Sequence, residues 1–151
     1  MDSKNYKKYR WFFTSSGKLV VGGKSAEQND SLLSELKKQS KDLIVLHTSS
    51  PGSPFSIILA EGQVSKKDLE ETAIFTASFS QQWKQNKKSA EVDIFSLSQL
   101  IKSEKMKLGS WNVFGKTQRK KVSLLLYFAV QENTLRAVPF QSNEFPLRIS
   151  P

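Results

Sequence analysis

The residues with the clearest chemical potential lie where an apolar stretch meets a helix start. Gly22-Gly23-Lys24 ends the apolar stretch, and Ser25 followed by Gln28 is a capping-box pattern that predicts a helix N-terminus. Backbone N–H groups are unpaired there, and the helix dipole favours negative charge. The succession therefore indicates an anion site. The simpler interpretation is a turn that uses glycine for its backbone angles and carries a solvated lysine, and the residues alone favour it.

His47 is the only histidine of the chain, and it ends an apolar stretch just before Pro51-Gly52-Ser53-Pro54. A metal site needs several N, S or O ligands, so one histidine without any cysteine predicts neither a metal nor a cofactor. No Gly-x-Ser-x-Gly motif and no base–nucleophile pair indicates catalysis. Two interpretations of His47 stay open: a strand-end histidine bonded to backbone, or a pocket residue that contacts a phosphate or a ribose.

A second candidate surface is a cationic segment in the last third of the chain. Its cations stand against Glu104 alone: Lys102, Lys105, Lys107, Lys116, Arg119, Lys120 and Lys121. Trp111 and Phe114 are interleaved with them, and exposed aromatics beside cations suit single-stranded or loop RNA. The alternative is that the two aromatic rings belong to the core and the lysines form a solvated rim.

Composition narrows the class of protein. The chain has 151 residues, enough for one domain with a core, and 23 Lys+Arg against 14 Asp+Glu give a net charge of +9. Such an excess indicates nucleic acid or another polyanion, although a merely soluble cationic protein would show it too. The absence of cysteine excludes disulfides and thiolate chemistry. With no membrane-length apolar run and no secretory signal, we expect a cytoplasmic protein without membrane contact.

The apolar pattern predicts a single α+β domain, with a mixed, mainly antiparallel β-sheet and two principal helices packed on it. Residues 9–140 would form this domain, residues 1–8 a flexible basic arm and residues 141–151 an extended tail. Helices are expected over residues 25–39 and 65–85. Strands are expected at residues 10–13, 18–21, 43–46, 55–60, 92–95, 111–114, 122–130 and 134–140, with a polar turn at 116–121.

Several segments, in this order and spacing, resemble a known family. They are Tyr9-Arg10-Trp11-Phe12-Phe13, Ser16-Gly17-Lys18-Leu19-Val20-Val21-Gly22-Gly23-Lys24, Gln28-Asn29, Asp42-Leu43, His47, Gly52-Ser53-Pro54 and Gly109-Ser110-Trp111-Asn112-Val113-Phe114-Gly115-Lys116. Together they resemble NFACT-R, the RNA-binding domain of ribosome-quality-control factors that elongate stalled chains. Three positions depart from the family pattern. Lys24 stands for a usual arginine, Thr48 lies near a usual acidic residue, and Val45 lies near a frequent aromatic.

The resemblance implies a non-catalytic domain that binds tRNA or ribosomal RNA in translation or ribosome quality control, with the ribosome as a candidate partner. It implies that Lys24, Asn29, His47 and Ser53 converge at one end of the sheet. Late in the second helix, Phe79-Ser80 and Trp83-Lys84 stand where members carry a serine and a basic residue, and we interpret them first as core. The chain would be a stand-alone member or a piece of a longer factor.

Expected roles follow from the same resemblance. The amides of Gly22 and Gly23, with Lys24, would hold a phosphate. Asn29 and His47 would contact sugar or base. General affinity for the RNA backbone would come from Arg10, Lys116, Arg119 and Lys120. Two alternatives stay open: an enzyme acting on a nucleotide or phosphorylated substrate, and a basic module that binds an acidic protein.

Overall fold

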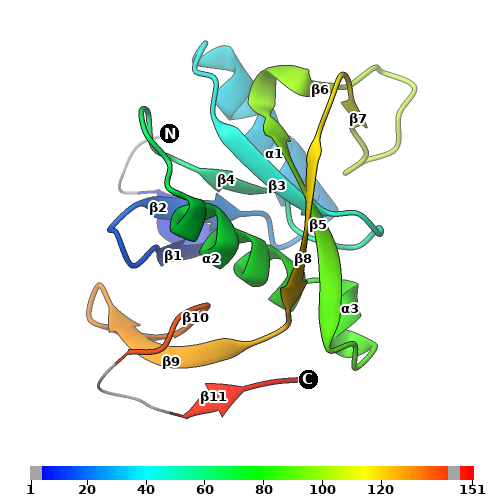
Figure 1. Cartoon of the computed structure of the whole chain (residues 1–151). Helices are drawn as coiled ribbons and strands as arrows, with labels where there is room; N and C mark the ends of the chain where they lie inside the picture. Colours follow the sequence, from blue (N-terminus) through cyan, green and yellow to red (C-terminus); the bar gives the residue numbers. More distant parts are fainter. Residues whose placement is uncertain (1–4, 143–146) are drawn as a thin grey trace.

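The computed structural model describes residues 5–142 and 147–151, which form an α+β domain (Figure 1). Its helical elements are η1 (Tyr6–Lys8), α1 (Ala26–Lys38), α2 (Lys66–Ser78), α3 (Gln81–Lys84) and η2 (Leu97–Gln99). Its strands are β1 (Arg10–Phe13), β2 (Leu19–Gly22), β3 (Ile44–Thr48), β4 (Ser56–Ile58), β5 (Ser89–Ser96), β6 (Leu100–Ile101), β7 (Asn112–Val113), β8 (Gln118–Ser123), β9 (Leu126–Gln131), β10 (Thr134–Val138) and β11 (Arg148–Ile149). Within these ranges no helix is long and apolar enough to cross a membrane.

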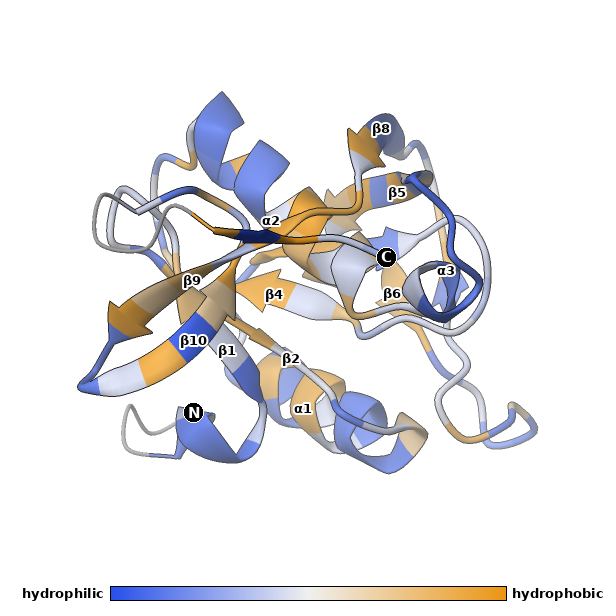
Figure 2. Cartoon of the chain, turned by 90° about the horizontal axis from the view of Figure 1, so that it is seen from below, coloured by the Kyte–Doolittle hydropathy of each residue, from blue (hydrophilic) through white to orange (hydrophobic). Residues whose placement is uncertain are grey.

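A six-stranded sheet in the order β1-β2-β4-β3-β5-β8 forms the centre of the domain. Each pair of neighbours in it is antiparallel. The two principal helices cover opposite faces, α1 on one side and α2 on the other (Figure 2). The predicted α+β class with two principal helices is therefore confirmed, and the sheet is antiparallel at all of these pairings.

Burial on both faces explains why the strands read as nearly continuous apolar runs. Successive side chains of a strand point to opposite faces. In β3, Val45 packs in the core under α1, whereas Leu46 packs in the core under α2. The same alternation separates Ile57 from Ile58 in β4. A one-residue slip of either strand would exchange the two cores, so the pattern fixes the register.

A second, three-stranded sheet in the order β10-β9-β11 covers the free edge of β1. The side-chain amide of Gln131 accepts from Phe13 N at 2.8 Å and donates to Phe13 O at 2.8 Å. Arg136 donates to Trp11 O at 2.8 Å and stacks over the Trp11 ring, 3.9 Å from its centroid. These side chains satisfy outward backbone groups of an edge strand that would otherwise invite pairing with another chain.

Three sequence expectations are wrong in detail. The single helix expected over residues 65–85 ends at Ser78, and Ser80 caps the separate α3 by accepting from Gln82 N. Residues 116–121 are not simply a turn, because β8 begins at Gln118 and pairs with β5. The expected strand over 122–130 is divided between the end of β8 and β9, which separate at residues 124 and 125. The sequence did not indicate β8 as a strand because its side chains are largely cationic. It lies at the edge of the sheet, where lysine is common.

The structure shows part of each end of the chain, and both parts contain regular elements. The loose arm expected over residues 1–8 falls partly outside the described residues, and within them η1 places Tyr6 in the core beside Trp11. The expected extended tail contains β11, which pairs with β9. The predicted pairing of residues 134–140 with the preceding strand is confirmed by the β9–β10 ladder.

Replacing Gln131 with alanine tests the role of this residue at the edge of β1. We expect Gln131→Ala to lower the free energy of unfolding by about 1–3 kcal/mol, because Phe13 loses both partners in a half-buried place. Urea denaturation measures the change. The matched control is Gln118→Ala on the exposed edge strand β8, which should change stability by less than about 0.5 kcal/mol. Equal effects of the two variants would contradict the edge-covering role.

Candidate nucleic-acid interface

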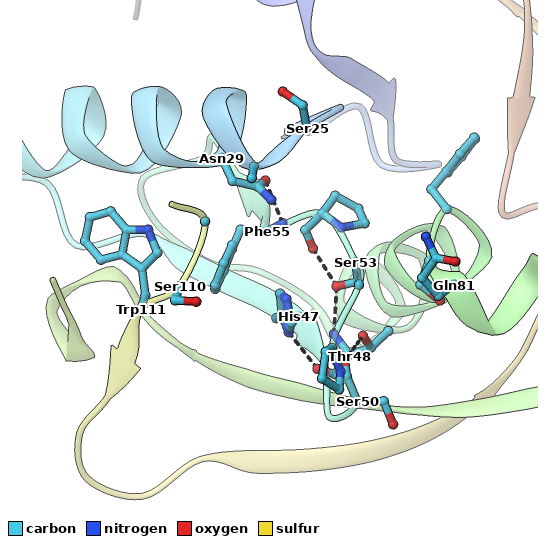
Figure 3. Close-up of a pocket in the computed structure, with 18 of the residues that line it drawn as sticks. Ser25, Asn29, His47, Thr48, Ser50, Ser53, Phe55, Gln81, Ser110 and Trp111 are labelled. Atoms are coloured by element: carbon cyan, nitrogen blue, oxygen red, sulfur yellow. Dashed lines mark hydrogen bonds between the residues drawn. The ribbon is translucent and has the colours of Figure 1, made fainter. Parts of the chain in front are cut away.

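A pocket of about 620 Å³ opens at the end of the sheet where β2 leads into α1 and β3 leads toward β4. Most of its lining comes from the turn from β2 into α1, the loop of residues 48–55, the start of α3 and the loop of residues 108–111. Side chains of β1, β3 and β5 add to it: Arg10, His47, Asp93 and Phe95. Figure 3 shows Asn29 on one side, Thr48 and Ser53 on the other, and His47 with Phe55 between them. Of the predicted site residues, Arg10, Gly23, Lys24, Asn29, His47 and Ser53 line this pocket.

The helix N-terminus predicted at Ser25 forms one wall. Ser25 Oγ accepts from Gln28 N at 3.1 Å, and Gln28 Oε1 accepts from Lys24 N at 2.9 Å. The first amides of α1, at Ala26 and Glu27, have no acceptor within the helix. Ala26 lines the pocket, so its amide remains to donate to an anion there.

Asn29 fixes this wall to the sheet. Its side chain is only 7% exposed, and Oδ1 accepts from Phe55 N at 3.1 Å. A Cβ atom on Gly23 would lie 2.2 Å from Oδ1, so only glycine permits this approach. Nδ2 has no acceptor among the described residues and remains as a donor at the pocket. Gly22 instead pairs with Ser56 in the sheet and does not line the pocket.

His47 lies on the pocket floor with one ring nitrogen engaged. Nδ1 lies 2.6 Å from Thr48 O, and because a carbonyl only accepts, Nδ1 carries the proton. The ring lies against Phe55 with centroids 4.3 Å apart. Burial lowers the pKa of His47, although the bond to Thr48 and the charge of Asp93 act in the opposite direction. At neutral pH the imidazole is therefore neutral, and Nε2 is a hydrogen-bond acceptor.

Internal hydrogen bonds hold the loop after β3 in one shape. Ser53 Oγ accepts from Thr48 N at 3.1 Å and donates to Pro54 O at 2.9 Å. Gly52, at φ +88°, accepts from Gln81 N at 2.8 Å, which joins the loop to α3. The hydroxyl of Ser53 is thus engaged in shaping the loop and in holding it to the end of β3 at Thr48 (Figure 3).

The charge of the pocket is positive. Arg10 lies 4.6 Å from the Phe79 ring centroid, and no carboxylate pairs with it in the described part of the chain. Burial lowers the pKa of Arg10, but an arginine stays charged at any working pH. Lys24 and Lys84 are exposed at the rim. Phe79 and Lys84, both first interpreted as core, are therefore pocket residues.

Asp93 is the acid that lines the pocket, and its charge is compensated. Arg119 Nε donates to Asp93 Oδ1 at 2.8 Å, and Ser49 Oγ donates to the same oxygen at 2.9 Å. His47, Asp93 and Arg119 are direct neighbours across β3, β5 and β8. Arg119 thus lies beside the pocket as the partner of its acid.

The rest of the predicted cationic segment is divided in space. Lys120 lies 3.9 Å from Glu70 of α2, on the opposite face of the sheet from Arg119. Lys116 is exposed and does not line the pocket. Lys102 is half-buried and bonds to Asp30 at 2.9 Å. The structure therefore does not bring Lys116 or Lys120 to the pocket, and it gives Lys102 a structural task.

Asp30 organises the loop that closes the pocket, a role the sequence did not indicate. Its oxygens accept from Lys102 Nζ, from Gly109 N at 3.0 Å and from Trp111 Nε1 at 2.8 Å. Burial raises the pKa of Asp30, but these three hydrogen bonds outweigh burial and hold it below its ordinary value. Trp111 is half-buried by this contact, whereas Phe114 is 53% exposed.

Comparison with known proteins adds to this geometry. Residues 8–115 match the family described as the NFACT protein RNA binding domain. The chain belongs to this family. The matched residues contain every lining residue of the pocket, whereas Arg119, the partner of Asp93, stands after them on β8. Among the described residues, no three His, Asp or Glu side chains gather to hold a metal ion.

Two relatives illustrate how far the likeness extends. The NFACT domain is 38% identical over 84 residues to the archaeal Rqc2 homolog aRqcH of Methanocaldococcus jannaschii, which covers 55% of this chain and 12% of that protein. It shares its fold with the C-terminal part of the fibronectin/fibrinogen-binding protein of Streptococcus suis, with a TM-score of 0.63 and 23% identity. That match covers 74% of this chain and 44% of the other.

The lowered pKa of Asp30 makes its contribution to the stability of the NFACT domain depend on pH. The contribution is complete above the unfolded pKa of about 3.9 and is lost as pH falls through the lower folded pKa. We expect Asp30→Asn to cost about 1–3 kcal/mol from pH 7 to 5, with a smaller difference below about pH 4. Urea denaturation across this range measures it. Glu104→Gln, on the same loop, is the control. A difference in the free energy of unfolding between wild type and Asp30→Asn that grew at low pH would contradict the assignment.

Proposed function

We propose that this NFACT domain binds RNA by holding a backbone phosphate in the pocket. The observation that carries the proposal is Arg10, a half-buried cation that no carboxylate of the described residues neutralises. A buried charge is costly unless a partner compensates it, and a phosphate would do so. Lys24, Lys84 and the amide of Ala26 at the start of α1 add donors around the same pocket.

The size and lining of the pocket support a single nucleotide as the occupant. Pockets of about 300–1,000 Å³ hold ligands of this size. Phe55 and Trp111 offer apolar surface beside the donors. Outside the pocket, exposed Phe114 together with Lys105 and Lys107 extends a cationic and aromatic surface along which further nucleotides would lie.

We further infer that the RNA is tRNA or ribosomal RNA and that the domain acts in translation or ribosome quality control in the cytosol. Membership of the NFACT RNA-binding family and the 38% identity to an Rqc2 homolog support this. The chain matches only 12% of that relative, so the role concerns the domain and not the whole activity of the longer protein. A non-catalytic role is supported by His47, whose Nδ1 bonds a carbonyl and not an activating carboxylate.

Removing the pocket cation tests the proposal. We expect Arg10→Gln to weaken tRNA binding by about ten- to a hundredfold, the effect of losing a charged hydrogen bond. Titrations with tRNA, an unrelated single-stranded RNA and duplex DNA, each at low and moderate salt, measure it. Lys66→Gln, an exposed lysine on α2, removes the same charge far from the pocket and is the control. Equal losses for both variants would leave only non-specific attraction and sink the proposal.

A double mutant separates two roles for Arg119. We expect Arg119→Gln to weaken RNA binding about threefold to tenfold, because it leaves Asp93 as an uncompensated negative charge beside the phosphate. Adding Asp93→Asn should then restore binding toward the wild-type value. The measurement is the same tRNA titration, analysed as a double-mutant cycle. If Arg119 contacts RNA directly, as first expected, the double mutant will stay as weak as Arg119→Gln.

A further inference from the structure

The pocket contains a hydrogen-bond acceptor whose role is fixed by its surroundings. Thr48 O engages Nδ1 of His47 at 2.6 Å, and the Phe55 ring supports the imidazole from one side. Rotation of the ring by a half-turn about χ2 would break the bond to Thr48. Nε2 therefore keeps its lone pair toward the pocket, and a group that binds there must donate.

Most of the other fixed polar groups of the pocket are donors, and the exception is the carboxylate of Asp93. Arg10 carries guanidinium N–H groups, Asn29 presents Nδ2, and the first turn of α1 presents backbone amides. Asn29 is only 7% exposed, its Oδ1 is engaged by Phe55 N, and its Nδ2 has no acceptor within the described ranges, so Nδ2 is available to a ligand. Asp93 Oδ1 already accepts from Ser49 and Arg119. A ligand complementary to this set is an anion with a hydrogen-bond donor close to it.

We propose that His47 Nε2 accepts a hydrogen bond from a ribose 2′-hydroxyl, so that the pocket distinguishes RNA from DNA. The inference rests on the proposed function, since it assumes that the donors hold a backbone phosphate. Every ribonucleotide carries a 2′-hydroxyl close to its phosphates, whatever its base, and this hydroxyl is the group by which proteins tell RNA from DNA. A phosphate oxygen cannot take the place at Nε2, because both atoms are acceptors.

Base N–H groups are the competing donors, and the geometry favours the sugar. A phosphate held by Arg10 and α1 keeps its own ribose beside it through covalent bonds, whereas the base projects away from the backbone. The apolar surface of Trp111 lies to one side of His47 and Phe55 (Figure 3), where a base can stack. The sugar is thus placed over His47 while the base faces the aromatic wall.

The test uses a short oligouridylate in three forms: with ribose, with 2′-fluoro sugars and with 2′-deoxy sugars. The 2′-fluoro form keeps the RNA-like sugar pucker but cannot donate at this position. We expect the wild-type chain to bind the ribose form about five- to tenfold more tightly than either other form, the effect of one hydrogen bond. In His47→Phe, which keeps a ring against Phe55, the three affinities should become equal. Fluorescence anisotropy measures them.

Each outcome decides the question. A preference for ribose that persists in His47→Phe, or a wild-type chain that binds all three forms alike, overturns the inference while RNA binding itself stands. An equal loss of affinity for all three forms in His47→Phe assigns Nε2 to a base and also overturns it. If Arg10→Gln fails to weaken any form, the proposed function fails instead. His47→Gln, which can still accept, should keep part of the preference and serves if His47→Phe does not fold.

Discussion

The hydrogen bond from Phe55 N to the side chain of Asn29 is the contact on which the site depends. It ties the first turn of α1 to the segment that enters β4, and it requires Gly23 because a Cβ atom would collide with Asn29. This bond fixes the N-terminus of α1 against the start of β4. The free amides of α1, the ring of His47 and the loop after β3 acquire fixed relative positions from this one buried amide.

The central elements were predictable because the local sequence pattern of each one agrees with the packing it has in the folded domain. The hairpin of β1 and β2, the capped start of α1 and the apolar runs of β3 and β4 each carry a pattern that matches its final place. β8 was not predictable in this way. Its sequence is cationic because it lies at the edge of the sheet, and only pairing with β5 makes it a strand. The break between α2 and α3 depends on Ser80, whose capping role shows only in the folded chain.

Much of the pocket was predictable for a different reason. Its parts follow one another in sequence: Gly23, the start of α1, the end of β3 and the proline loop after it. The antiparallel topology brings them back to one end of the sheet. The contacts of Asp30 were hidden, because Trp111 lies 81 residues away and no local pattern joins them. The basic segment near the C-terminus misled for a related reason: charge along a strand alternates between two faces, so Arg119 and Lys120 serve opposite sides of the sheet.

The cover over β1 comes from residues beyond those that match the family. Without those residues, the backbone groups of Trp11 and Phe13 on the outer side of β1 would lack these partners. In this chain two side chains, those of Gln131 and Arg136, supply the partners. The segment that follows the family match therefore protects the outer strand of the central sheet, which could otherwise pair with another chain.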